Sequence, residues 1–198
     1  MYTRILGLDL AGSEKKQTGY CLIENSEIVD YGILFTDEQI KSYVKENKIS
    51  LVAIDAPFNL PKKGNLRDCD ILMKQIGLHP LPPTLPGMRI LVGRVKKLLV
   101  WFKEQGIQTI EVFPAGAILF LGFSRKPKSI AERIKYLREI MKALGLQSRR
   151  VIGRLLPDEF DGIICAIVGY AYATNNYIEV KGKECKVIFP AELSKWNL

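Results

Sequence analysis

The sequence ILGLDLAG at residues 5–12 carries the main clue to the fold, and LVAIDAP at residues 51–57 repeats its pattern. Each stretch is a short apolar run that ends in an acid, Asp9 in the first and Asp55 in the second. Such a run, bounded by turn residues, is typical of a buried strand. Because an unpaired carboxylate beside a buried strand costs far more free energy than a surface charge, we expect the two aspartates to share a cation.

Two further aspartates, Asp158 and Asp161, open an apolar segment that we expect to be helical from about residue 158 to residue 174. Side chains three residues apart on a helix share one face, about 5–6 Å from each other. The alternative is that acids at a helix start cap free N–H groups and favour the helix dipole. This alternative explains Asp158 as well as a metal site does. It explains Asp161 less well, because Asp161 lies inside the first turn among mostly apolar neighbours.

A fifth acid, Glu111, lies near the end of another expected strand, residues 107–113. Alone it could simply be solvated. Together with Asp9 and Asp55, however, it would lie near the C-terminal end of one of three parallel strands. Open α/β sheets bind their ligands at that edge, so the combination favours a functional site over three unrelated acids.

The remaining pattern predicts a mixed α/β domain over residues 1–198. We expect strands at residues 3–10, 18–24, 27–35, 51–55 and 107–113 and two short final strands joined by the turn Lys181-Gly182-Lys183. Helices are expected at about residues 37–48, 67–76, 88–105, 130–144 and 158–174, with a short one from Pro114. Six prolines make residues 56–87 a largely irregular insertion, and long irregular segments are often functional.

The few cysteines and the single histidine limit the kinds of catalytic and metal site that this sequence can form. The four cysteines, which include no Cys-x-x-Cys pair, are expected to be free and mostly buried thiols, without a zinc site. His79 is the only histidine, which disfavours histidine-based triads and zinc centres. If this chain is an enzyme, carboxylates must carry its chemistry.

The net charge of +8 is concentrated in one segment. Residues 123–154 hold ten basic side chains against two acidic ones, an excess equal to that of the whole chain. A basic segment of this kind can bind nucleic-acid phosphates, although it could also be an ordinary solvated helix surface. No apolar stretch approaches the roughly 20 residues of a membrane span, and no signal peptide is visible. We therefore expect a cytoplasmic protein that does not contact a membrane.

These motifs, in this order, resemble a family described as predicted nucleases with the ribonuclease-H-like fold. The resemblance covers nearly the whole chain. The stretches that carry it are GLDLAG at residues 7–12, IDAP at 54–57, RDCD at 67–70, EVFP at 111–114, DEFD at 158–161 and VIFP at 187–190.

The resemblance implies a five-stranded mixed sheet of order 3-2-1-4-5 with flanking helices, and a divalent-metal-dependent nuclease. By analogy with RuvC-type junction resolvases, Asp9 would bridge two cations, Asp55 would hold one, and Asp161 or Asp158 the other. Glu111 departs from the resolvase pattern and belongs to the narrower family; it is a candidate catalytic residue, and whether it is also a metal ligand is left open. Ligand sets made only of oxygen suit Mg²⁺ or Mn²⁺. Basic side chains would bind the flanking phosphates; the candidates are Lys62, Lys63, Arg67, Arg133 and Arg138.

Several alternatives remain open at this point. Arg67 could instead form a salt bridge with Asp68 or Asp70. The chain could be a nucleic-acid-binding module without catalysis. The segment LDLAGS at residues 8–13 also resembles the phosphate loop of sugar kinases and actin-like ATPases, which need two related domains where this sequence predicts one. The sequence does not distinguish DNA from RNA, and it leaves the oligomeric state open, although a resolvase would suit a dimer.

Overall fold

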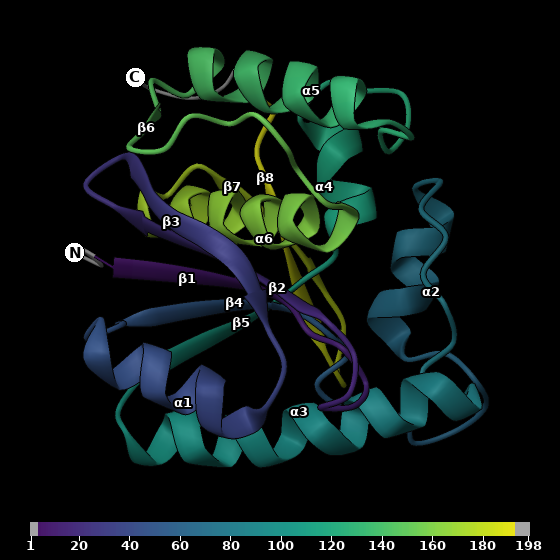
Figure 1. Ribbon diagram of the computed structural model, residues 1–198. Coiled ribbons are helices and arrows are strands. Elements are labelled where there is room, and N and C mark those ends of the chain that lie inside the picture. Colours follow the sequence, from purple (N-terminus) through teal and green to yellow (C-terminus); the bar gives the residue numbers. More distant parts are fainter. Residues whose placement is uncertain (1–3, 193–198) are drawn as a thin grey trace.

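The computed structural model describes residues 4–192, in which one mixed sheet is flanked by helices (Figure 1). The strands are β1 Arg4–Asp9, β2 Thr18–Glu24, β3 Glu27–Leu34, β4 Leu51–Asp55, β5 Gln108–Val112, β6 Gln147–Ser148, β7 Tyr177–Lys181 and β8 Lys186–Pro190. The helices are α1 Asp37–Glu46, α2 Asp68–Gln75, α3 Pro86–Glu104, α4 Pro114–Phe120, α5 Ile130–Ala143 and α6 Pro157–Ala173. Within the described residues, no helix combines the length and the apolar character that crossing a membrane requires.

The sheet is larger than the sequence predicted. Its strand order is β6-β3-β2-β1-β4-β5-β8-β7. The predicted order 3-2-1-4-5 forms its interior, with β1 parallel to β4 and β4 parallel to β5. The prediction of five strands was wrong because β6 pairs with β3 at one edge, and β8 and β7 extend the other edge. The two final strands were expected as a hairpin, but nothing in their sequence indicated that the hairpin joins the main sheet.

Local signals account for several helix boundaries. The Thr36 side chain accepts a hydrogen bond from the Gln39 amide, and the Gln39 side chain accepts one from the Thr36 amide, so α1 begins with a capping box. The Ser129 hydroxyl accepts a hydrogen bond from the Glu132 amide at the start of α5. Proline occupies the first position of α6, where its missing N–H needs no partner.

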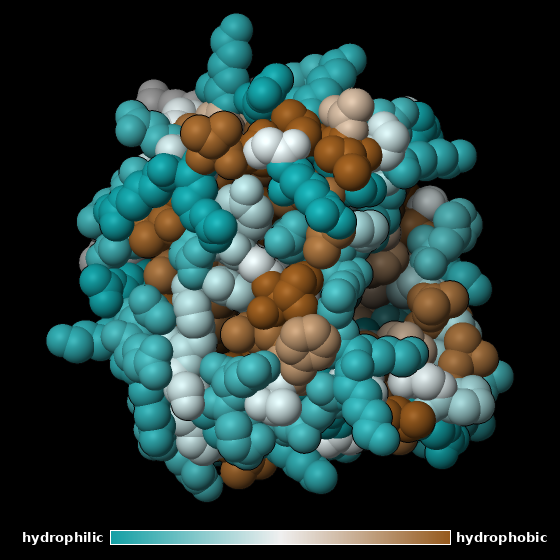
Figure 2. All heavy atoms as spheres, viewed as in Figure 1, coloured by the Kyte–Doolittle hydropathy of each residue, from teal (hydrophilic) through white to brown (hydrophobic). Residues whose placement is uncertain are grey.

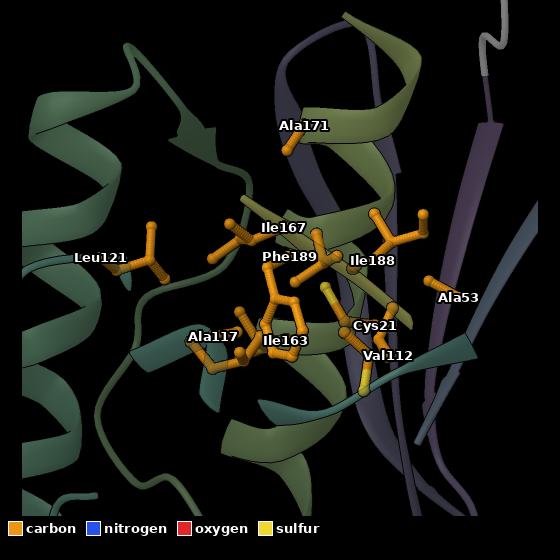
Figure 3. Close-up of a cluster of buried hydrophobic side chains, with 14 of the residues drawn as sticks. Cys21, Ala53, Val112, Ala117, Leu121, Ile163, Ile167, Ala171, Ile188 and Phe189 are labelled. Carbon is orange, nitrogen blue, oxygen red and sulfur yellow. The ribbon is translucent and has the colours of Figure 1, made fainter. Parts of the chain in front are cut away.

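Two apolar clusters lie on opposite faces of the sheet. On one face α6 packs against β1, β2 and β4, with α4 and α5 beyond it (Figure 1). Residues such as Ala53, Val112, Ile163, Ile167 and Phe189 fill this cluster (Figure 3). On the other face α1 and α3 cover Leu6, Leu8, Val52 and Ile54. Burial of both faces explains why β1 and β4 read as continuous apolar runs.

Helix α6 approaches the sheet at backbone distance because glycines line the contact. A Cβ atom on Gly7 of β1 would lie 2.2 Å from the Ala166 backbone nitrogen, and one on Gly162 of α6 would lie 2.7 Å from the Gly19 carbonyl carbon. Both separations are shorter than real Cβ contacts, so neither position can carry a side chain without displacing the helix. The glycines therefore set how close the first turns of α6 come to the ends of β1 and β2.

A matched pair of helical glycines tests this contact. We expect Gly162→Ala to lower the free energy of unfolding by about 1–3 kcal/mol, because the added methyl group must push α6 off the sheet. Gly93 lies on an exposed face of α3, where an added Cβ meets nothing within 4 Å. Gly93→Ala should therefore raise the free energy of unfolding by up to about 1 kcal/mol. Urea unfolding of both variants measures the difference, and equal effects would contradict the close-packing account.

Candidate active site

The two strand-end aspartates face the same helix. Asp9 is the last residue of β1 and Asp55 the last residue of β4. Side chains alternate along a strand, and Gly7 and Ala53, two residues earlier, both face α6. Asp9 and Asp55 therefore point toward the α6 side of the sheet, where Asp161 lies on the first turns of the helix. The structure thus brings together three of the acids that the sequence singled out.

The electrostatics of the three carboxylates reflect their burial and closeness. Burial, followed by the charges of Asp161 and Asp158, raises the pKa of Asp9 to about 7. Burial and then the charge of Asp9 raise the pKa of Asp55 well above its ordinary value. Burial likewise raises the pKa of Asp161, although Lys126 opposes that shift. Without a bound cation, ionisation of these three carboxylates therefore lowers the free energy of unfolding.

Lys126 is a member of the site that the sequence did not single out. It lies in the loop between α4 and α5, and its Nζ donates a hydrogen bond to Asp161 Oδ2 in an ion pair. Its charge also lowers the pKa values of Asp9 and Asp55. In the sequence, Lys126 was one of ten basic residues in the segment 123–154, and nothing local distinguished it from the others.

The donor set fits a hard divalent cation. Asp161 Oδ1 is buried and has no hydrogen-bond partner among the described residues. A buried carboxylate oxygen of this kind normally has a partner, and an oxygen-ligated cation would supply one. The potential ligand atoms of Asp9, Asp55 and Asp161 are not gathered as tightly as those of Asp68, Cys69 and Cys185, which lie within 4.8 Å of one another. That second group offers no thiolate, because its two cysteines are joined in a disulfide.

Asp158 lies one turn before Asp161, in the first turn of α6. Its charge raises the pKa values of Asp9 and Asp161, so its carboxylate lies near both. The N-cap residue of α6 is Leu156, whose amide donates a hydrogen bond to the Glu159 carboxylate and whose side chain makes no capping bond. Asp158 therefore does not occupy the N-cap position, and its charge acts on the cluster.

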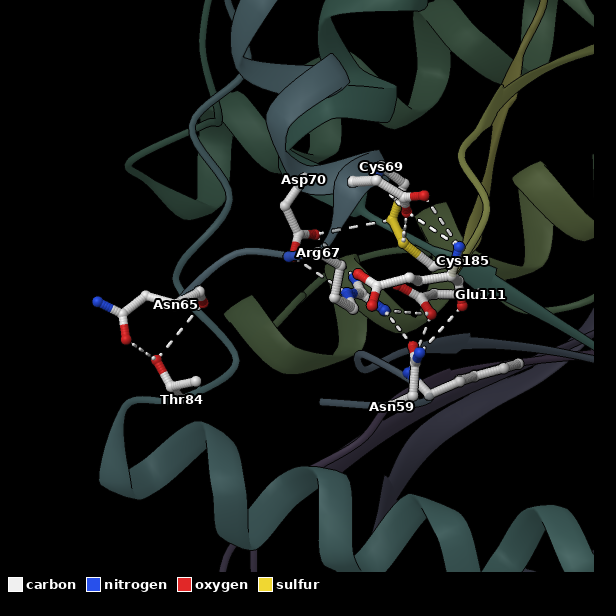
Figure 4. A network of polar contacts seen from close by, with 11 residues as sticks. Asn59, Asn65, Arg67, Cys69, Asp70, Thr84, Glu111 and Cys185 are labelled. Atoms are coloured by element: carbon white, nitrogen blue, oxygen red, sulfur yellow. Dashed lines mark hydrogen bonds and ion pairs between the residues drawn. A yellow bond between two sulfur atoms is a disulfide. The ribbon is translucent and has the colours of Figure 1, made fainter. Parts of the chain in front are cut away.

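Glu111 belongs to a different network from the one predicted. In the parallel pair β4–β5 it lies beside Ile54, whereas Asp55 lies beside Val112. Its side chain therefore starts from the opposite face of the strand to that of Asp55, and at the edge of the sheet it lines the same cavity as Asp55. There it accepts hydrogen bonds from Arg67 Nη1 at 2.9 Å, Arg67 Nη2 at 2.7 Å and the Phe58 amide at 2.9 Å (Figure 4). Glu111 is thus a partner of Arg67 at the edge of the site.

The assignment of Arg67 to substrate phosphate is corrected by its contacts. Nε and Nη2 donate to Asp70 at 3.0 and 2.8 Å, Nη1 and Nη2 donate to Glu111, and Nη1 also donates to Asn59 Oδ1 at 3.2 Å (Figure 4). These bonds use all five guanidinium N–H groups, and the side chain is 2% exposed. Arg67 has no donor left for a phosphate. The salt-bridge alternative holds for Asp70, with Glu111 as an additional partner.

The other candidate phosphate ligands fall into two groups. Lys62 and Lys63, in the loop before α2, and Arg138 on α5 are exposed and available to a ligand. Arg133 is buried, and its Nε donates to the Leu155 carbonyl at 2.8 Å. Its charge lowers the pKa of Asp161, so it contributes to the site through the electrostatic field rather than from an exposed surface.

A disulfide between Cys69 and Cys185 corrects the expectation of four free thiols. Only Cys21 and Cys165 are free, and both are buried. The bond links the start of α2 to the turn of the β7–β8 hairpin, where the Asp68 carboxylate also accepts hydrogen bonds from the Lys183 and Glu184 amides. The two cysteines are 116 residues apart in the sequence, so only the tertiary fold reveals that they meet.

Part of the aspartate cluster and part of the Arg67 network line one cavity of about 190 Å³. Asp9 and Asp55 contribute to its wall together with Arg67, Asp70 and Glu111. The rest of the lining is apolar and comes from α2, the loop before α3, α3 itself, β5, β8 and the segments that follow β1, β4 and β5. The irregular segment predicted at residues 56–87 therefore forms part of the site, and α2 lies within this segment as a helix.

No family model matches the sequence, and no curated protein matches it. The solved structure of T. thermophilus RuvC in complex with a Holliday junction substrate matches with a TM-score of 0.50 and 14% sequence identity, covering 86% of this chain and 94% of that chain. The chain shares the RuvC fold. At this identity the likeness shows the fold alone, and it agrees with the ribonuclease-H-like architecture that the motifs implied.

The raised pKa of Asp9 predicts a pH-dependent cost to stability. Because the folded-state pKa of about 7 exceeds the ordinary 3.8, ionisation of Asp9 destabilises the folded protein. That cost is absent below about pH 4, grows between pH 4 and 7, and is complete above pH 7. In a chelator-containing buffer, Asp9→Asn should therefore raise the melting temperature at pH 8, by roughly 2–4 °C per kcal/mol relieved, and raise it little at pH 4. An equal change at both pH values, or a decrease at pH 8, would contradict this account.

Proposed function

We propose that this protein is a divalent-metal-dependent nuclease that hydrolyses phosphodiester bonds of DNA or RNA. The observation that carries the proposal is the convergence of three partly buried carboxylates, of which Asp161 has a buried oxygen without a partner among the described residues. Buried charges persist in proteins when they are paired or coordinate metals. The motif resemblance to predicted nucleases and the shared RuvC fold support the same assignment.

The proposed ligands are Asp9 between two Mg²⁺ or Mn²⁺ ions, Asp55 on one ion, and Asp161 on the other with Asp158 beside it. Two such ions, when bound, lower the pKa of a water molecule and stabilise the charge that develops on the leaving oxygen. The carboxylates hold these charges in a partly buried setting, where electrostatic interactions are stronger than in bulk water. Neutralisation of the cluster would also remove the stability cost of its raised pKa values.

Lys126 would act in two states of the proposed site. In the structure its ammonium is paired with Asp161, and it is the basic group bound directly to the cluster among the described contacts. With cations bound to the carboxylates, that pairing would weaken, and the ammonium would be free to bind a non-bridging phosphate oxygen of the substrate. Lys62, Lys63 and Arg138 would bind phosphates farther from the cut, because they are exposed and lie outside the cluster.

Cleavage assays test the proposed function. The protein is incubated with Mg²⁺ or Mn²⁺ and labelled single-stranded DNA, duplex DNA, RNA, an RNA–DNA hybrid or a four-way junction. We expect cleavage of at least one substrate, and a loss of about a hundredfold or more in Asp9→Asn, because charge stabilisation at the reacting phosphate depends on the cluster. Glu104→Gln, at the exposed end of α3, is the control and should cleave like the wild type.

The outcomes separate the nuclease from a binding module. Equal cleavage by wild type and Asp9→Asn would point to a contaminating nuclease and contradict the proposal. Salt-sensitive binding without cleavage of any substrate would instead identify a nucleic-acid-binding protein that has this fold but no catalytic activity.

A further inference from the structure

The cavity beside the aspartate cluster is larger than a metal site requires. Its volume is about 190 Å³, whereas one water molecule needs roughly 10–15 Å³ on the same measure. Asp9 and Asp55 lie in its wall, and the remaining lining extends away from them toward α2 and α3. The cavity therefore has room for a group attached to whatever the carboxylates bind.

The walls of this extension are mostly apolar. They include Met73 of α2, Leu81 of the loop before α3, Met88 and Leu91 of α3, and Phe113 after β5. Leu81 is 62% exposed, which places an apolar side chain at the rim. In Figure 2, hydrophobic residues lie in a hollow between the α2 segment and the body of the protein. A surface of this composition is unsuited to a sugar–phosphate backbone and suited to a flat, largely apolar group.

The charges in the cavity exclude an anion from the same space. Four acids, Asp9, Asp55, Asp70 and Glu111, contribute to the lining, and Arg67 is the basic residue among them. All five N–H groups of Arg67 are already bonded to Asp70, Glu111 and Asn59. The field in the cavity is therefore negative, with no free cationic donor. This field disfavours an anionic occupant, the apolar walls disfavour a charged group of either sign, and N–H donors on the edge of an uncharged occupant would be favoured.

We propose that this cavity receives one unstacked nucleobase of the substrate, adjacent to the phosphate held at the carboxylates. This inference rests on the proposed nuclease function and specifies its substrate class. A nucleobase is flat, uncharged and carries N–H groups on its edge, and aromatic or apolar side chains such as Phe113 bind its face without regard to sequence. Since a paired base would have to leave the helix first, single strands, bulges and junctions are cleaved in preference to intact duplex.

Two measurements test the base pocket without relying on each other. In the first, wild-type protein cleaves single strands in which an abasic residue replaces each nucleotide near the cut in turn. Removal of the base that occupies the cavity should slow cleavage by about tenfold, and its neighbours should matter less. In the second, Ca²⁺ replaces Mg²⁺ or Mn²⁺ as a cation for the carboxylates, 2-aminopurine is moved along the same strand, and its fluorescence should rise on binding at one position.

A pair of tryptophan variants tests whether this cavity is where the nucleobase binds. Met88→Trp fills it from the first turn of α3, and Val100→Trp places the same side chain on the exposed face of that helix. We expect Met88→Trp to abolish the fluorescence rise and to slow cleavage of the intact strand about tenfold, with little effect on the abasic strand. Val100→Trp should behave like the wild type. Thermal melting confirms that both variants are folded.

The failures of the two proposals are distinguishable. Strand binding without a 2-aminopurine response at any position, or cleavage insensitive to every abasic substitution, would overturn the base pocket and leave the nuclease intact. A localised 2-aminopurine response without cleavage would overturn the nuclease and retain the base site. A strand that neither binds nor is cleaved would overturn both.

Discussion

The backbone-distance packing of α6 on β1 and β2 is the constraint on which the site depends. Gly7, Gly19 and Gly162 leave no side chain between the helix and the sheet, so the helix start lies directly against the strand ends. Asp161 is thereby brought close enough to Asp9 to raise its pKa. A methyl group added at one of these glycines would push α6 away from the sheet and move Asp161 away from Asp9. The same close packing therefore stabilises the fold and positions the carboxylates.

A second set of contacts holds the opposite wall of the cavity. Arg67 joins α2 to β5 through Asp70 and Glu111, and a disulfide joins the same helix to the β7–β8 hairpin. Removal of one member of a buried ion network costs several kcal/mol, because it leaves an unpaired charge. Residues 56–87, which the sequence predicted to be largely irregular, are thus held in place by an ion network and a disulfide. This segment can therefore present a preformed apolar wall beside the carboxylates.

The sequence predicted the parts of the fold that depend on local periodicity. Apolar runs predicted β4 at residues 51–55, and the acid at each strand end indicated the candidate site. The inner strand order came from the family resemblance rather than from periodicity. Alternation along β5 could also have separated Glu111 from the aspartate cluster itself, because Ile110 and Val112 occupy the face that Asp55 shares. Contacts between distant residues had no such signal: Arg67 and Glu111 are 44 positions apart, and Lys126 reaches Asp161 from a loop 35 positions earlier.

The central claim is that α6 and the two strand ends together form a site for a pair of divalent cations. Electron paramagnetic resonance of Mn²⁺ titrated into the protein tests it directly. The account predicts two saturable ions that are magnetically coupled, as expected for a separation of about 3.5–4 Å, and loss of the coupling in Asp9→Asn. Absence of saturable Mn²⁺ binding by the wild type, or an identical coupled spectrum from Asp9→Asn, would contradict it.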